Sequence, residues 1–82
     1  MHQFEYTIKD ENGVHARPAG LIVRRAQEFD FDVEIECNGR KASLKKLLAL
    51  MGMGIKCGDT VTVRAPKGKD IAPLKAFFEE NI

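Results

Sequence analysis

Residues 31–43 read FDVEIECNGRKAS, and this stretch decides the fold. Its apolar positions, 31, 33, 35 and 37, alternate with acidic ones, which predicts a strand over residues 31–37 with one buried face. Asn38-Gly39 is the strongest short signal for a β-hairpin, so residues 40–43 are expected to return antiparallel. Cys37 continues the apolar alternation, which indicates a small core residue rather than a reactive thiol.

Two further segments have apolar residues at every second position and are also predicted as strands. They are residues 2–8, ahead of the hairpin, and residues 60–65, after it. Strands and helices intermix, giving the expected order β-α-β-β-α-β-α. Because one hairpin is explicit and most strands have one apolar face, we predict an α+β fold: an antiparallel sheet with helices packed on one side.

Three segments are predicted as helices. From residue 16 the apolar period changes to that of a helical face, and Pro18 is compatible with a helix's first turn. A short second helix is expected over residues 44–51, where good helix formers precede Gly52. Asp70 is expected to cap the last helix, with Pro73 in its first turn.

Size and composition limit the function. The chain has 82 residues, 44% of them hydrophobic, so we expect one domain over residues 1–82 and chemistry at the surface rather than in a deep cleft. A formal charge of +1 demands neither nucleic acid nor a membrane as partner, and no apolar run approaches the ~18 residues of a membrane span. Two cysteines outside CxxC spacing, without a signal peptide, indicate reduced thiols in a soluble cytoplasmic protein.

The charged residues are clustered, with acids at positions 30, 32, 34 and 36 and bases at 40, 41, 45, 46 and 56. Two solvated faces are the simplest interpretation, and a mildly basic face that meets an acidic protein is the alternative. A nucleic-acid-binding module would rest only on the basic stretch and would require steeply salt-dependent binding, which we do not expect. The sequence has neither metal-ligand spacing nor a glycine-rich phosphate loop, so no metal and no cofactor is expected.

His15 is the strongest candidate for chemistry because it lies immediately before the first predicted helix. A helix start offers unpaired backbone N–H groups and the positive end of the macrodipole, which favour a negative group. The amides of Ala16 and Arg17 are free to donate there, whereas Pro18 has none. An imidazole is largely uncharged near neutral pH and is a competent nucleophile. Phosphoryl is therefore the obvious anionic group for His15 to accept.

Several apolar residues do not fit a core. Leu21 projects away from the apolar face of the first helix, on the side shared with Arg17 and Arg24. The second helix carries apolar residues around most of its circumference, and two interpretations are open: the helix is buried all round, or part of it stays outside as an adaptable docking surface. We call the residues that would form this docking surface the apolar patch; they are Leu21, Leu47, Leu48 and Met51.

The segment from Gly13 to Ala19, GVHARPA, resembles the HPr family, the histidine-containing phosphocarriers of the bacterial sugar phosphotransferase system. The resemblance extends to Asn38-Gly39-Arg40, to residues 44–55, to residues 58–63 and to the closing amphipathic helix, so it covers nearly the whole chain. It implies an open-faced β-sandwich, a four-stranded antiparallel sheet covered on one side by three helices.

The resemblance also implies a role for each candidate residue. His15 would take a phosphoryl group on Nδ1 from enzyme I and pass it to enzyme IIA proteins or domains of sugar transporters. Arg17 would stabilise the transferred charge, and the backbone amides of Ala16 and Arg17 would bind the phosphate. The protein would be a carrier rather than an enzyme, and a monomer that makes transient complexes. The residues implied in partner docking are Leu21, Arg24, Leu47, Leu48 and Met51.

The resemblance leaves an alternative function open, and one departure from the family argues against one form of regulation. The alternative is an HPr-like regulatory binding module, or a carrier in a nitrogen-related phosphorelay. Many relatives carry a serine, phosphorylated by a dedicated kinase, where this chain has Lys46. A lysine cannot be esterified in that way, so we do not expect serine-linked control. Ser43 is interpreted as a turn or helix-start hydroxyl.

Overall fold

The computed structural model describes all 82 residues and contains four strands and three helices. The order along the chain is β-α-β-β-α-β-α, as predicted. The elements are β1 (Gln3–Thr7), α1 (Ala16–Ala26), β2 (Glu34–Cys37), β3 (Arg40–Ser43), α2 (Leu47–Met51), β4 (Thr60–Arg64) and α3 (Ala72–Asn81).

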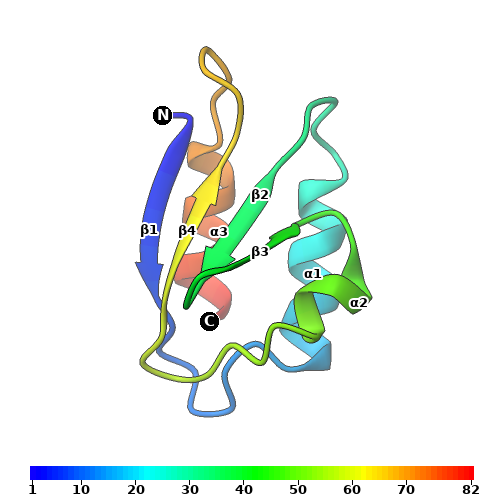
Figure 1. The fold of residues 1–82 in the computed structure, drawn as a ribbon. Coiled ribbons are helices and arrows are strands. Elements are labelled where there is room, and N and C mark those ends of the chain that lie inside the picture. Colours follow the sequence, from blue (N-terminus) through cyan, green and yellow to red (C-terminus); the bar gives the residue numbers. More distant parts are fainter.

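The four strands form one antiparallel sheet in the order β1-β4-β2-β3. β4, the last strand in the sequence, lies between β1 and β2 and pairs with both: Val63 is opposite Phe4 on one side and Ile35 on the other. All three helices lie on one side of the sheet (Figure 1). The predicted fold class, an open-faced β-sandwich of the α+β type, is confirmed.

The core lies between the sheet and the helices. Phe78 of α3 is fully buried and meets Phe4 and Tyr6 of β1 edge to face, with ring centroids 5.6 and 5.9 Å apart. Edge-to-face aromatic pairs stabilise a core beyond the area they bury. Cys37 is buried among these apolar residues, as its place in the alternation predicts.

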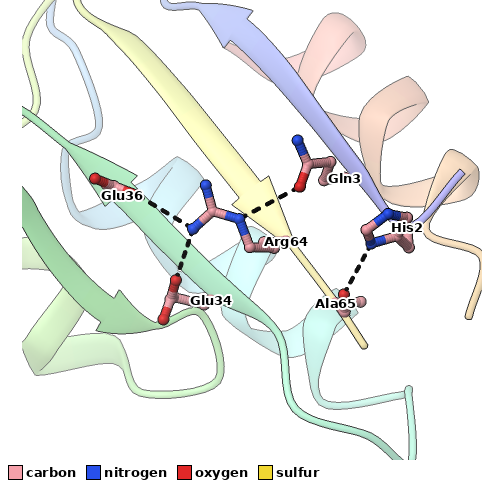
Figure 2. Close-up of polar contacts among 6 residues, drawn as sticks. All are labelled: His2, Gln3, Glu34, Glu36, Arg64 and Ala65. Carbon is pink, nitrogen blue, oxygen red and sulfur yellow. Dashed lines mark hydrogen bonds and ion pairs between the residues drawn. The ribbon is translucent and has the colours of Figure 1, made fainter. Parts of the chain in front are cut away.

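The face of the sheet away from the helices is open, and Arg64, the last residue of β4, contacts polar residues of both neighbouring strands there (Figure 2). One guanidinium nitrogen of Arg64 donates to Glu34 at 3.0 Å and to Glu36 at 3.2 Å, and another donates to Gln3 of β1 at 3.4 Å. The hydrogen bond to Glu36, followed by that to Glu34, raises the pKa of Arg64. Two of the clustered acids therefore form ion pairs within the sheet, in agreement with a solvated face.

The hairpin turn between β2 and β3 has the expected backbone. Asn38 and Gly39 both have positive φ, 53° and 79°, which is the conformation of a type I′ turn. The first strand of this hairpin is shorter than predicted, however, because it begins at Glu34 rather than at residue 31. Glu34 pairs with Ser43 of β3 and Arg64 of β4, which are the last residues of those strands, so no strand residue lies opposite residues 31–33.

Two helix starts also differ from the predictions. α2 begins at Leu47 rather than at residue 44, because the hairpin continues past Ser43: the amide of Leu44 donates to the carbonyl of Val33 at 2.8 Å, and Leu44 is fully buried. The hydroxyl of Ser43 accepts from the amide of Lys45 at 3.2 Å, the turn role expected for it.

The cap residue of α3 is Ile71 and not Asp70. Asp70 lies one position too early, yet its carboxylate still accepts a hydrogen bond from the amide of Ala72 at 3.0 Å. One of the unpaired donors of the first turn is therefore satisfied from outside the helix.

Candidate functional site

His15 is the N-cap of α1, and its side chain makes no hydrogen bond to the helix. The residue is extended, with φ −90° and ψ −179°, while its carbonyl accepts the first helical hydrogen bond from Ala19 at 3.0 Å. The imidazole makes no capping hydrogen bond and is 41% exposed. The chain reaches this position through Gly13, whose φ of 66° turns it toward the helix, and through Val14, whose side chain is buried in the core.

The first turn of α1 offers unpaired donors beside this imidazole. The amides of Ala16 and Arg17 have no hydrogen-bond partner, and Pro18 at the third helical position has no amide to offer. The first turn contains no acidic residue that would compete for these donors. The start of α1 therefore presents two free N–H groups and a partial positive charge to an anion.

A shallow surface hollow surrounds the imidazole and contains groups of both charges. Arg17 is exposed at its edge and takes part in none of the structure's ion pairs. The carboxylate of Asp10 also lines the hollow, with Oδ2 3.6 Å from Nε2 of His15. The residues that line the hollow are Asp10, His15, Arg17, Pro18, Leu21 and Asn81.

The apolar patch is exposed. Leu48 on α2 is 83% exposed, and Leu21, Leu47 and Met51 are each about 40% exposed, as α2 buries only Leu50. The interpretation of α2 as a helix buried all round is therefore wrong. A five-residue helix cannot turn all of its apolar side chains toward the core, because they lie on different sides of it.

α2 lies beside α1 (Figure 1), and side chains from the segments next to both helices hold it there. Gln27, just after α1, donates from its side chain to the carbonyl of Lys45 at 3.0 Å, and the ammonium of Lys45 donates to the carbonyl of Phe29 at 2.7 Å. Lys45 therefore bonds to the protein's own backbone, so one positive charge fewer of the basic stretch is available to a partner. Lys46 is the N-cap of α2 and is exposed.

The structure brings some of the sequence candidates together and leaves others apart. His15, Arg17 and Leu21 line one hollow, whereas Leu47, Leu48 and Met51 belong to the neighbouring helix. Arg24 is exposed on α1, one turn beyond Leu21. No group of three or more His, Cys, Asp or Glu side chains could hold a metal ion, and none of the helices has the length and apolar character needed to cross a lipid bilayer.

Sequence reasoning missed two residues of the hollow, Asp10 and Asn81. The Asp-x-Asn-Gly pattern of residues 10–13 favours a turn, and the carboxylate of Asp10 does accept the amide of Asn12 at 2.9 Å in an Asx turn. Asn81 comes from the last turn of α3, and its side chain donates to the carbonyl of Phe77 at 2.8 Å. Nothing local in the sequence connects residue 81 with residue 15.

Fold and site together define a small α+β protein that presents one histidine at an exposed helix start. The chain matches the family model described as the PTS HPr component phosphorylation site over residues 2–80. It therefore belongs to the HPr family, the phosphocarriers of the phosphotransferase system.

Solved structures agree with this assignment. The chain is 30% identical to the histidine-containing phosphocarrier protein of Mycoplasma, with a TM-score of 0.82 over 96% of this chain and 89% of that one. It is 28% identical to the phosphocarrier protein HPr of Bacillus anthracis, with a TM-score of 0.81 over 98% and 94%. It is also similar to Crh, a catabolite repression protein of Bacillus subtilis, at 32% identity and a TM-score of 0.70 over 100% and 98%; Crh was seen as a domain-swapped dimer.

Proposed function

We propose that this protein accepts a phosphoryl group on Nδ1 of His15 from enzyme I and passes it to enzyme IIA proteins or domains of sugar transport systems. The observation that carries the proposal is the exposed imidazole of His15, with no capping hydrogen bond, beside the unpaired amides at the start of α1. An imidazole at such a place can form a bond to phosphorus while the helix start binds the phosphate oxygens.

The energetics of the site suit a carrier. Unpaired amides at an exposed helix start stabilise an anion by typically ~0.3–1 kcal/mol, so the phosphohistidine is favoured without being trapped. Arg17 adds a charge-assisted contact as the phosphoryl group passes between two histidines, because its guanidinium is free of other ion pairs. In each direction the P–N bond of the donor breaks as the P–N bond of the acceptor forms.

The apolar patch would position the partner protein for transfer. Transfer in line requires a partner histidine to come close to His15, so a docking surface next to the hollow is part of the mechanism. Leu21 belongs both to the patch and to the wall of the hollow, which makes docking and transfer spatially continuous. Arg24, one turn beyond Leu21, completes the proposed docking surface. Short-lived complexes of a monomer fit an open surface of this size.

The test is phosphorylation by phosphoenolpyruvate and enzyme I. We expect an acid-labile, alkali-stable phosphate on the wild-type protein and none on His15→Ala. The chain has only one other histidine, His2, which lies just before β1 and contacts the carbonyl of Ala65, the residue after β4 (Figure 2). His2→Gln is therefore the matched control and should label like wild type. Absence of label on the wild-type protein would overturn the carrier function, and labelling of His15→Ala would overturn the site.

A second candidate, a regulatory binding module, is supported by the likeness to the catabolite repression protein of Bacillus subtilis. The free imidazole of His15 favours transfer over regulation alone. Restoration of sugar uptake in cells that lack their own carrier would support the transport role, because a pure regulator does not restore uptake. A nitrogen-related relay would show as transfer of the phosphoryl group to a nitrogen-type enzyme IIA and not to a sugar-type one.

A further inference from the structure

Asp10 faces the ring nitrogen of His15 that the proposed reaction does not use. Its Oδ2 lies 3.6 Å from Nε2, while its Oδ1 accepts the amide of Asn12 at 2.9 Å. The two carboxylate oxygens thus have separate partners, one in the loop backbone and one toward the imidazole. Nδ1 of His15 makes no capping hydrogen bond, and the ion-pair contact of the ring is at Nε2.

The carboxylate of Asp10 is held in place by its own backbone as well as by the Asx turn. The amide of Asp10 donates to the carbonyl of Ile82 at 2.8 Å, and the carbonyl of Asp10 accepts from Gly13 at 2.8 Å. Its side chain is 28% exposed, less than the 41% of His15. The carboxylate therefore keeps its direction toward His15 instead of sampling solvent freely.

A neutral imidazole carries its proton on either Nδ1 or Nε2, and the surroundings of each nitrogen select the tautomer. An ionised carboxylate only accepts, so the nitrogen that faces it is the one that keeps its hydrogen. At 3.6 Å the contact is longer than a direct hydrogen bond, and it acts through the attraction between the carboxylate charge and the N–H dipole.

We propose that Asp10 is a positioning residue that keeps the proton of neutral His15 on Nε2, so that Nδ1 carries the lone pair for attack on phosphorus. The inference rests on the proposed carrier function and deepens it. As the Nδ1–P bond forms, the P–N bond of the donor breaks and its electron pair returns to the donor nitrogen. The proton on Nε2 stays where it is, and the carboxylate of Asp10 balances the positive charge that the ring gains.

The test begins with the tautomer itself. In protein with ¹⁵N-labelled histidine, the nitrogen chemical shifts of neutral His15 report which nitrogen is protonated. We expect the Nε2–H form to predominate in the wild type. A wild-type protein in which neutral His15 is mostly Nδ1–H would overturn the inference without any variant.

Asp10→Asn tests the contact with little change of shape. The amide oxygen of asparagine can still accept from Asn12, which places its NH₂ group toward Nε2 and favours the opposite tautomer. We expect the Nδ1–H fraction to rise and phosphorylation by enzyme I to slow by roughly two- to threefold, because the partial positive charge of the NH₂ group now opposes the reactive form. Asp10→Glu, which restores a carboxylate, should recover part of the rate.

Glu11→Gln is the matched control because it removes the same charge from the neighbouring residue, whose exposed side chain has no partner in the structure. Its tautomer ratio and rate should equal those of the wild type. If Asp10→Asn matches Glu11→Gln in both measurements while the wild type is phosphorylated, the role of Asp10 falls and the carrier function stands. If the wild type is not phosphorylated at all, the carrier function falls, whatever the tautomer.

Discussion

The backbone amide of Val14 donates to the carbonyl of Ile55 over 3.0 Å, which fastens the loop ahead of His15 to the segment that leaves α2. The two segments approach so closely that a Cβ on Gly13 would lie 2.5 Å from the carbonyl oxygen of Ile55 and 2.8 Å from Cα of Lys56. A glycine is therefore required at position 13 for two reasons: a side chain would collide with the segment after α2, and the backbone has a positive φ. The contact connects the imidazole with the helix that carries most of the apolar patch.

Gly13→Ala should be more destabilising than Gly54→Ala, although the two glycines have nearly the same φ, 66° and 65°. A left-handed alanine costs roughly 1–2 kcal/mol at either place, but only Gly13 has backbone atoms in the space of the new Cβ. Denaturant unfolding measures the difference, and faster hydrogen exchange of the Val14 amide would show that the loop has moved. Equal losses of stability in the two variants would contradict the close approach.

Leu50 and Leu48 lie two residues apart on α2, and substitution should affect stability at Leu50 and partner binding at Leu48. Leu50 is 1% exposed, so Leu50→Ala should lower the free energy of unfolding by about 2–5 kcal/mol. Leu48 is 83% exposed, so Leu48→Ala should change stability by less than about 0.5 kcal/mol while weakening binding to enzyme I. Calorimetric binding and denaturant unfolding separate the two effects. Unaltered affinity in Leu48→Ala would remove that residue from the proposed docking surface.

Asp70 should make the stability of the fold depend on acidic pH. The hydrogen bond from the amide of Ala72, followed by the hydrogen bond from the terminal ammonium of Met1, lowers the pKa of the Asp70 carboxyl. A lowered pKa in the folded state means that the stabilisation is complete above the ordinary value of about 3.9 and is lost as the pH falls through the folded value. The stability advantage of the wild type over Asp70→Asn should therefore shrink below about pH 4, as followed by thermal unfolding. An advantage that stays constant with pH would show that the carboxylate charge is not responsible.

The two cysteines should differ in reactivity. Burial in the sheet, followed by the charge of Asp59, raises the pKa of the Cys37 thiol, and the thiolate is the reactive form. Cys57 is exposed, with its thiol directed to the carbonyl of Lys9 at 3.7 Å. Iodoacetamide should therefore modify Cys57 in the folded protein and reach Cys37 only after unfolding, as measured by peptide mass spectrometry. Denatured protein, in which both thiols react, is the control; equal rates in the folded state would refute the prediction.

Much of the fold was predictable because its signals are local. A period of two over residues 31–37 and the dipeptide Asn38-Gly39 are enough to predict the hairpin, and the change of period at Ala16 predicts α1. The placement of His15 at a helix start follows from the same local change. The boundaries of β2, α2 and α3 were less predictable, because they depend on where a partner strand ends or which side chain reaches a free amide.

By itself, the sequence determined the kinds of element, their order, the apolar face of most of them and the histidine at the start of α1, since all of these depend on neighbours within one or two turns of the chain. Only the tertiary structure decided that β4 lies between β1 and β2, that the apolar patch stays outside the core, and that Asp10 and Asn81 meet His15 in one hollow. The place of β4 and the contact of Asn81 with the hollow join segments far apart in the sequence. Their physical cause is the packing of the helices on one face of the sheet, which no local pattern of residues expresses.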